Sequence, residues 1–163
     1  MRVLRRLHDE NGVSLDKIFV ISPFRDVSRK CRALVRARRA TPLGRGQGQD
    51  QDQESLFEGG MPADGKAVIT ATQDKVEAFV KDRVGTVHTM QGKEADVVIL
   101  VLGTGHSGGA RDWAANQVNL LNVAVSRARR RLFVIGGYDE WATAGTFAAL
   151  SKRLPAWHEP PSS

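Results

Sequence analysis

The chain has 163 residues and a formal net charge of +6, with 41% hydrophobic and 26% charged residues. This length suffices for one domain with its own core, and no apolar run approaches the roughly 20 residues needed to cross a bilayer. Its single cysteine, Cys31, excludes an internal disulfide and a cysteine-based metal cage. The basic residues after Met1 are not followed by the apolar stretch of a secretory signal. We therefore expect a cytoplasmic protein, and its arginine-rich excess of positive charge favours an anionic partner such as nucleic acid or nucleotide.

The first half of the chain predicts a strand followed by a helix. Residues 17–22 form a short apolar run that ends at Pro23, which is typical of a buried strand. Residues 24–39 carry apolar side chains at helical spacing, with arginines on the opposite face. These arginines suggest a solvated helix face or, less simply, a stripe that binds nucleic acid: Arg29, Arg32, Arg36, Arg38 and Arg39.

Residues 41–65 differ in composition from the rest of the chain. They are rich in Gly, Gln and Asp and contain too little apolar surface to offset the entropy of ordering them. We interpret this stretch as a mobile insertion loop rather than a domain boundary. Residues 1–163 are therefore expected to form a single domain.

Beyond the insertion, strands and helices are expected to alternate. The patterns predict strands over residues 67–70, 84–88, 96–102 and 131–136, and helices over residues 72–81, 113–128 and 139–153. Continuous apolar strands that alternate with helices indicate an α/β domain with a largely parallel sheet.

One segment comes close to a phosphate-binding loop. Residues 60–67 nearly match the pattern G-x-x-x-x-G-K-[ST], but Ala67 lacks the hydroxyl that binds Mg²⁺. The segment also follows a polar stretch and enters a strand, whereas a phosphate-binding loop leaves a strand and opens a helix. We interpret the match as accidental.

A second segment offers an alternative function. Residues 105–109 match G-x-S-x-G around Ser107, and Asp139 and His158 follow in the order of a serine hydrolase. However, Gly103 and Thr104 separate the motif from the preceding strand, and His158 lies in a proline-rich tail that would hold a catalytic base poorly. A glycine-rich connection between a strand and a helix is the simpler interpretation.

Three blocks of the sequence, taken in order, resemble conserved motifs of superfamily 1 helicases. Residues 20–25 (VISPFR) resemble motif IV, residues 85–100 (GTVHTMQGKEADVVIL) motif V, and residues 120–136 (LLNVAVSRARRRLFVIG) motif VI. The QGKE and NVAVSRAR forms are closest to the RNA-surveillance and flap-processing branch, the SF1B or AAA_12-like branch. The resemblance covers about residues 17–155 apart from the insertion, and implies the C-terminal, second RecA-like domain of such an enzyme.

The resemblance implies a role for this domain in ATP hydrolysis. In the family two RecA-like domains clamp ATP between them, and Arg127 occupies the position of the arginine finger, which stabilises charge on the transferring phosphoryl group. The residues expected to face the nucleotide are Gln91, Gly92, Glu94, Arg127 and Arg130. Glu94 would accept hydrogen bonds from a ribose or order the metal shell. On a continuous helix Arg129 would point away from Arg127, and Arg130 would lie one turn from it.

The same resemblance implies a track for single-stranded DNA or RNA. Short donors after a strand end position a phosphate backbone without reading its sequence. The residues expected to contact nucleic acid are Ser22, Phe24, Arg25, Thr86, His88, Thr89 and Asn122.

The family's phosphate-binding loop and metal-binding carboxylates have no counterpart in the sequence. We therefore expect ATP and Mg²⁺ to be cofactors of a complete enzyme and not to bind to this chain alone, which would be inactive by itself. Its expected partner is an N-terminal RecA-like helicase domain that carries the Walker A and B motifs. The main alternative is a stand-alone nucleic-acid-binding module without ATPase activity.

Overall fold

A computed structural model describes residues 2–37, 71–90, 92–103 and 108–156, and the sheet that they form has four parallel strands. The strands are β1 (Ile18–Ser22), β2 (Val84–Thr86), β3 (Ala95–Gly103) and β4 (Ala128–Gly136), in the spatial order β2-β1-β3-β4. With helices between the strands, this architecture confirms the predicted α/β class and is consistent with a RecA-like domain.

The two central strands are buried on both faces. Along β1, Phe19 and Ile21 belong to one core cluster, whereas Ile18 and Val20 belong to the other. β3 alternates in the same way, since Val98, Leu100 and Leu102 join the first cluster and Val97 and Ile99 the second. This period of two is the geometry of a strand, and it explains why both strands read as continuous apolar runs.

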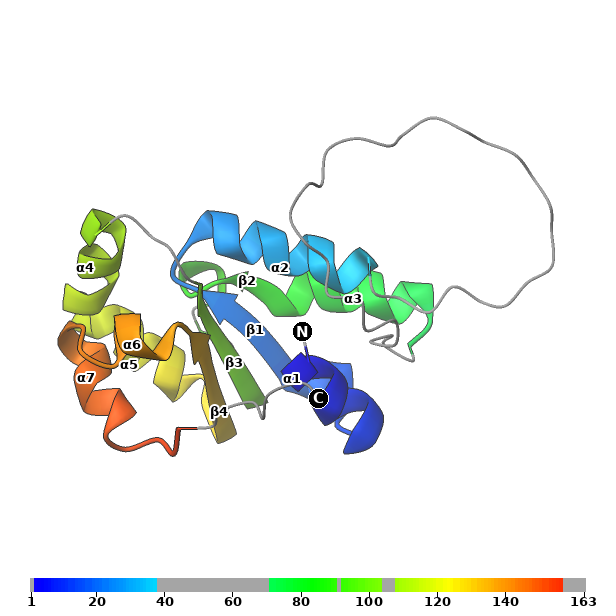
Figure 1. The fold of residues 1–163 in the computed structure, drawn as a ribbon. Helices are drawn as coiled ribbons and strands as arrows, with labels where there is room; N and C mark the ends of the chain where they lie inside the picture. The colour runs from blue at the N-terminus through cyan, green and yellow to red at the C-terminus, as the bar shows by residue number, and fades with distance from the viewer. Residues whose placement is uncertain (1, 38–70, 91, 104–107, 157–163) are drawn as a thin grey trace, which may run out of the picture.

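Each face of the sheet has its own set of helices (Figure 1). The second cluster packs against α1 (Arg2–Arg5), α2 (Arg25–Ala37) and α3 (Gln73–Arg83). The first packs against α4 (Gly108–Asn116), α5 (Val118–Ser126), α6 (Tyr138–Trp141) and α7 (Gly145–Ser151). In Figure 1, α4 to α7 gather to the left of the sheet.

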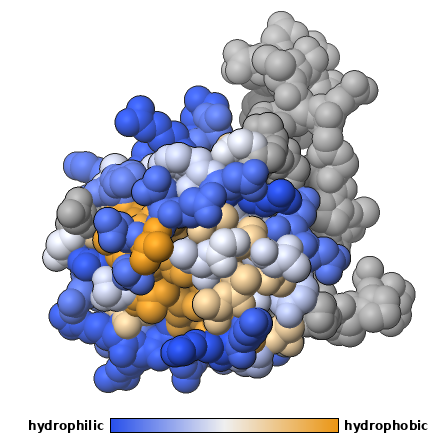
Figure 2. Space-filling model, turned by 90° about the vertical axis from the view of Figure 1, so that its left-hand side faces the viewer, coloured by the Kyte–Doolittle hydropathy of each residue, from blue (hydrophilic) through white to orange (hydrophobic). Residues whose placement is uncertain are grey.

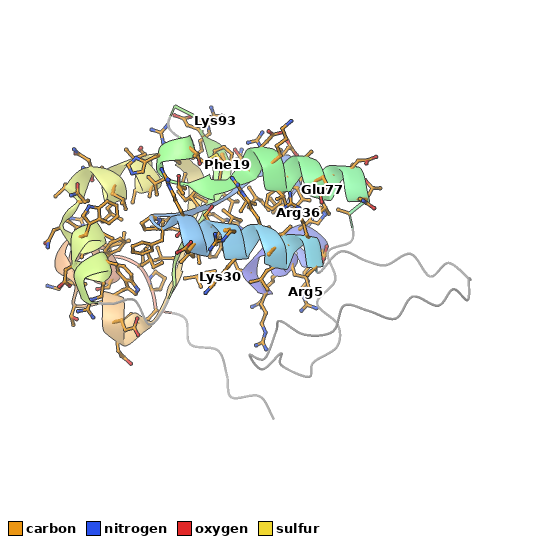
Figure 3. All side chains as sticks on the ribbon, turned by 90° about the horizontal axis from the view of Figure 1, so that it is seen from above. Arg5, Phe19, Lys30, Arg36, Glu77 and Lys93 are labelled. Atoms are coloured by element: carbon orange, nitrogen blue, oxygen red, sulfur yellow. The ribbon has the colours of Figure 1, made fainter. Side chains whose placement is uncertain are left out.

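Two arginines of α2 connect this helix to β2 and α3 through polar contacts. The Arg32 Nε donates to the Val84 carbonyl at 2.8 Å, and the Arg36 Nε lies 3.0 Å from a carboxylate oxygen of Glu77 on α3. Figure 3 shows Arg36 and Glu77 facing each other between the two helices. The arginine face of α2 was expected to be either solvated or a nucleic-acid stripe. Arg29 and Arg36 are exposed, as on a solvated face, and Arg32 and Arg36 also join α2 to β2 and α3. Arg38 and Arg39 lie outside the described residues.

Two predicted helices are each broken in two. The helix expected over residues 113–128 is α4 followed by α5, with Gln117 between them in a non-helical conformation (φ −88°, ψ 85°). The helix expected over residues 139–153 is α6 followed by α7, which begins at Gly145 with φ +41°. A Cβ at Gly145 would lie 2.8 Å from the Ala115 carbonyl carbon, so α4 and α7 approach each other there more closely than a side chain allows.

Other boundaries shift less. The strand expected over residues 84–88 ends at Thr86 and continues as a 3₁₀ turn over His88–Met90. Before β1 the chain forms α1, a π-helical turn over Arg6–Glu10 and a 3₁₀ turn over Leu15–Lys17, none of which the sequence predicted.

Several expectations concern parts of the chain outside the described residues. They include the insertion at 41–65, the strand at 67–70 and the near-match to a phosphate-binding loop at 60–67. Within the described residues, no helix is both long and apolar enough to cross a membrane.

Candidate nucleotide and nucleic-acid surfaces

The residues expected to contact nucleic acid gather mainly at the carboxyl ends of β1 and β2. Ser22 ends β1 and pairs in register with Thr86, which ends β2, and the Val87 amide donates to the Ser22 carbonyl at 3.0 Å. Carboxyl ends of parallel strands are where α/β folds bind ligands. We call Ser22, Phe24, Arg25, Thr86, His88 and Thr89 the carboxyl-edge group.

The Ser22 side chain supports this edge from within. Ser22 is only 1% exposed, and its hydroxyl oxygen accepts a hydrogen bond from the Phe24 amide at 3.1 Å. It therefore shapes the turn that leads from β1 into α2 and presents no free surface to a phosphate. Arg25, the first residue of α2, is exposed beside it.

Thr86 and Thr89 close a tight turn with each other. The Thr89 hydroxyl donates to the Thr86 carbonyl at 2.9 Å and accepts from the Thr86 amide at 2.9 Å. The Thr89 amide in turn donates to the Thr86 hydroxyl at 3.3 Å. A Cβ at Gly85 would collide with the Thr89 hydroxyl oxygen and come within 2.9 Å of the Met90 methyl group. The two hydroxyls thus hold the turn, and the side chain of His88 is exposed within it.

Glu94 and Arg127, two of the residues expected to face the nucleotide, lie at the opposite edge of the sheet. Glu94 immediately precedes β3 and Arg127 immediately precedes β4, whose first residues, Ala95 and Ala128, are paired. Leu100, five residues beyond Ala95, is level with Ile21 near the end of β1. At about 3.3 Å per residue, the two edges are about 17 Å apart along the strands. The segment after β2 therefore connects the two edges instead of staying at the carboxyl edge.

Arg127 directly follows α5, and its guanidinium is held against the backbone. Nε donates to the Val123 carbonyl at 3.2 Å, Nη1 to the Lys93 carbonyl at 3.1 Å and Nη2 to the Ser126 hydroxyl at 3.1 Å. The Ala95 amide also donates to the Arg127 carbonyl at 3.0 Å. The side-chain bonds use three of the five guanidinium N–H groups and leave two for an anion.

Glu94 forms an ion pair with Arg129, in which the Arg129 Nε lies 2.8 Å from a Glu94 carboxylate oxygen. The hydrogen bond and charge of Arg129 lower the pKa of the Glu94 carboxyl, and the charge of Arg127 adds to this effect. The same hydrogen bond raises the pKa of Arg129. Arg127, Glu94 and Arg129 thus form one charged cluster, which we call the amino-edge cluster.

The structure corrects the helix that was expected to continue through residue 128 in the motif VI segment. Residues 128–136 are strand, so Arg129 and Arg130 do not continue the helix that ends at Ser126. The expectation that Arg129 points away from the nucleotide residues is therefore wrong, as is the placement of Arg130 one helical turn from Arg127. The Arg130 Nε lies 4.0 Å from an Asp96 carboxylate oxygen.

A register shift allows both arginines to lie near acidic side chains. Ala95 of β3 pairs with Ala128 of β4. The next pair, Val97 with Arg131, lies two residues further along β3 but three residues further along β4. Arg129 and Arg130 therefore stand together opposite one position of β3, as two residues do at a β-bulge. The sequence did not reveal this arrangement.

Three further residues remain from the predicted sites: Gly92 and Gln91 on the nucleotide side, and Asn122 among the nucleic-acid contacts. Gly92 has a φ of +80°, a conformation that favours glycine, and Gln91 lies outside the described residues. Asn122 is exposed in the middle of α5. It lies on the same face of that helix as Val118 and Val125, which are four residues before it and three after it.

The hydrolase alternative gains no support from the described residues. Ser107 and His158 lie outside them, and Asp139 is exposed on α6. Among the described residues no three His, Cys, Asp or Glu side chains are grouped to hold a metal ion. The Glu94 carboxylate is already held by Arg129, so the described side chains fit an anion such as phosphate better than they fit Mg²⁺.

One side of the molecule exposes apolar side chains. Figure 2 looks at the side that carries α4, α5 and α7, where apolar residues gather within a hydrophilic surround. The large apolar side chains exposed on these helices are Trp113, Val118 and Val125, which are 46%, 55% and 39% exposed.

Comparison with known families agrees with the geometry. No curated protein matches the chain. The model of the AAA_12 family, described as an AAA domain, matches residues 1–139 and so includes all three helicase-like blocks. This match confirms the predicted resemblance, and the chain belongs to the AAA_12 family of AAA domains, the family of the C-terminal domain of superfamily 1B helicases.

Proposed function

We propose that the chain is the second motor domain of an ATP-dependent superfamily 1 helicase. Arg127 carries the proposal: its guanidinium is anchored by the Lys93 and Val123 carbonyls and keeps two N–H groups for a phosphate. A guanidinium fixed before the reaction stabilises charge on the transferring phosphoryl oxygens without having to be reorganised. Arg127 acts here as the finger, while Gln91, Gly92, Glu94 and Arg130 line the nucleotide side.

The ATP and Mg²⁺ would be held mainly by the partner domain. A first RecA-like domain with the Walker A and B motifs supplies the phosphate-binding loop and the metal ligands, and ATP hydrolysis requires both domains. Val118, Asn122 and Val125 form an exposed stripe on α5, which suits contact with that domain. When bound there, ATP supplies the energy for movement along nucleic acid.

The carboxyl-edge group forms the other half of the proposed mechanism. Arg25 and His88 are exposed there, and the turn between Thr86 and Thr89 fixes the backbone beside them. The seven residues 87–93 connect this edge to Glu94, and Val87 and Met90 anchor them in the core. A displacement at the nucleotide would reach the nucleic acid through this short connection, which Val87 and Met90 tie to the core.

Binding to single-stranded nucleic acid tests the carboxyl-edge role. We expect the chain to bind single-stranded DNA or RNA weakly and without sequence preference, because its contacts are with the phosphate backbone. For two to four phosphate contacts, log K should fall with log salt with a slope of roughly −1.5 to −3. Fluorescence anisotropy with labelled oligonucleotides at several salt concentrations measures this slope. Binding that ignores salt, or that depends strongly on sequence, would count against the assignment.

A further inference from the structure

An exposed tryptophan stands beside the carboxyl-edge group. Trp113 on α4 is 46% exposed, and its ring centroid lies 6.4 Å from that of Phe24, with the rings tilted by 52°. Phe24 lies in the turn between β1 and α2, and Arg25 is the first residue of α2. Trp113 belongs to none of the three helicase-like blocks, so neither the sequence analysis nor the family match gives it a role.

The Trp113 ring rests on a rigid aromatic support. Phe24 also contacts Trp141, with ring centroids 6.3 Å apart, and Trp141 meets Phe147 edge to face at 5.0 Å. Trp141 is only 4% exposed, and its indole N–H donates to the Gly103 carbonyl at the end of β3 at 3.1 Å. A Cβ at Gly136 would lie 3.0 Å from the Trp141 ring, so Trp141 is closely confined. An exposed ring supported in this way loses little conformational freedom when a ligand stacks on it.

The surroundings of Trp113 on α4 are polar. Arg111 and Asp112 precede it and form an ion pair at 3.5 Å, and exposed Asn116 follows one turn later. The other large apolar side chains exposed among the described residues lie on other helices: Leu34, Val118, Val125 and Tyr138. Trp113 is thus the one large aromatic ring exposed on the described part of α4, with polar neighbours on that helix, and the exposed cation Arg25 stands one residue beyond its partner Phe24. A ring and a cation placed in this way suit a nucleobase and its phosphate.

We propose that Trp113 stacks on an unpaired base of single-stranded nucleic acid whose backbone passes Arg25. This inference rests on the proposed nucleic-acid role of the carboxyl edge and adds a contact outside the three helicase-like blocks. Stacking tolerates any base, because every base presents a π-face. It holds one nucleotide in register without reading its identity.

Variants of Trp113 test the stacking contact in the chain itself. Stacking on an aromatic side chain is worth roughly 5- to 150-fold in affinity per base, so Trp113→Ala should weaken binding of a short oligothymidylate within that range. Trp113→Phe should retain most of the affinity because it keeps a π-face. Tyr138→Ala is the matched control, since Tyr138 is an aromatic residue 50% exposed on α6, and its affinity should equal that of the parent. Circular dichroism of each variant verifies that the fold is intact.

An oligonucleotide with abasic sites separates stacking from phosphate contacts. Loss of the bases should weaken binding to the parent and to Trp113→Phe, but should change binding to Trp113→Ala little, because that variant has no ring on which to stack. If Trp113→Ala binds the intact oligonucleotide as tightly as the parent, with the same salt slope, the stacking proposal fails while the proposed function stands. If the parent itself binds no oligonucleotide at low salt, the nucleic-acid role of the edge fails. If Trp113→Ala keeps its affinity for the oligonucleotide but no longer binds an added phosphate-loop domain, Trp113 is a protein contact and the proposal is overturned.

Discussion

Replacing Arg127 with alanine should reduce ATP turnover of the assembled two-domain enzyme by roughly 10³- to 10⁵-fold. Nucleotide and nucleic-acid affinity should change little, because a finger acts on charge that develops in the transition state and its loss falls on kcat. The backbone carbonyls of Val123 and Lys93 lose a donor in this variant. Since Arg127 is only partly buried, water can replace these bonds and the fold should survive.

Two further variants sharpen the Arg127 measurement. Arg127→Lys should be almost as damaging, since an ammonium cannot bind two carbonyls and a phosphate through the fixed fork of a guanidinium. Arg29→Ala removes an arginine that also forms an exposed ion pair, with Asp26 at 2.9 Å on α2, and should leave turnover unchanged. Steady-state ATPase kinetics on these variants and the parent decide the matter. An Arg127→Ala enzyme within tenfold of the parent kcat would remove Arg127 from the role of finger.

Removing Arg129 should lower ATP turnover by about tenfold, because Arg129 holds Glu94 beside Arg127. Without its partner the Glu94 carboxylate is free to turn toward the Arg127 guanidinium and compete with phosphate for it. Glu94→Ala removes a side chain proposed to line the nucleotide side, so it should produce a loss of similar size. Because the double variant has no carboxylate to compete with phosphate, it should lose less than the product of the two single losses. Multiplicative losses in that cycle would mean that the two side chains act independently.

The ionisation of Glu94 provides a second test of the ion pair between Glu94 and Arg129. Because its pKa in the folded chain is lowered, the Glu94 carboxylate is fully charged and paired above the ordinary carboxyl range. The stabilisation from the pair is present there and is lost as the pH falls through the lowered pKa. In Arg129→Ala the pKa of Glu94 should rise toward its ordinary value, which NMR titration of the side-chain carboxyl measures. An unchanged pKa would show that Arg129 does not hold Glu94 in solution.

The positions of the residues at the carboxyl edge were predictable because the apolar runs of the strands are clear in the sequence. β1 and β3 are continuous apolar runs, so positions such as Phe24 and Arg25 follow directly from where β1 ends. The family motifs then indicated Thr86, His88 and Thr89. Local pattern and strand order were sufficient, because in a parallel sheet the ends of the strands meet at one edge.

The amino-edge cluster was not predictable in the same way. The residues Val123 to Arg130 have no Gly or Pro to mark the end of a helix, so local sequence allowed one continuous helix through Ala128. Pairing of Ala128 with Ala95 instead begins a strand, and the register shift brings Arg129 to Glu94, 35 residues away in the chain. Long-range strand pairing overrides local propensity here, and a single sequence does not reveal its register.

The break at Gly145 has a similar origin. The segment from Tyr138 to Ser151 reads as one helix, but α7 packs against α4 so closely that the backbone needs a residue without a side chain and with positive φ. The glycine was visible in the sequence, whereas the neighbouring Ala115 backbone that requires it was not.

The central claim is that the chain supplies only part of an ATPase site. It is tested most directly by measuring phosphate release by the chain alone and again after addition of a phosphate-loop domain. With ATP, Mg²⁺ and saturating single-stranded DNA, the pure chain should release no phosphate above background, because Arg127 can stabilise a transition state only where another domain holds the phosphates. Addition of that domain should restore turnover that depends on Arg127. Turnover of roughly one per second or faster, within the ordinary range of enzymes, from the pure chain alone would contradict the account.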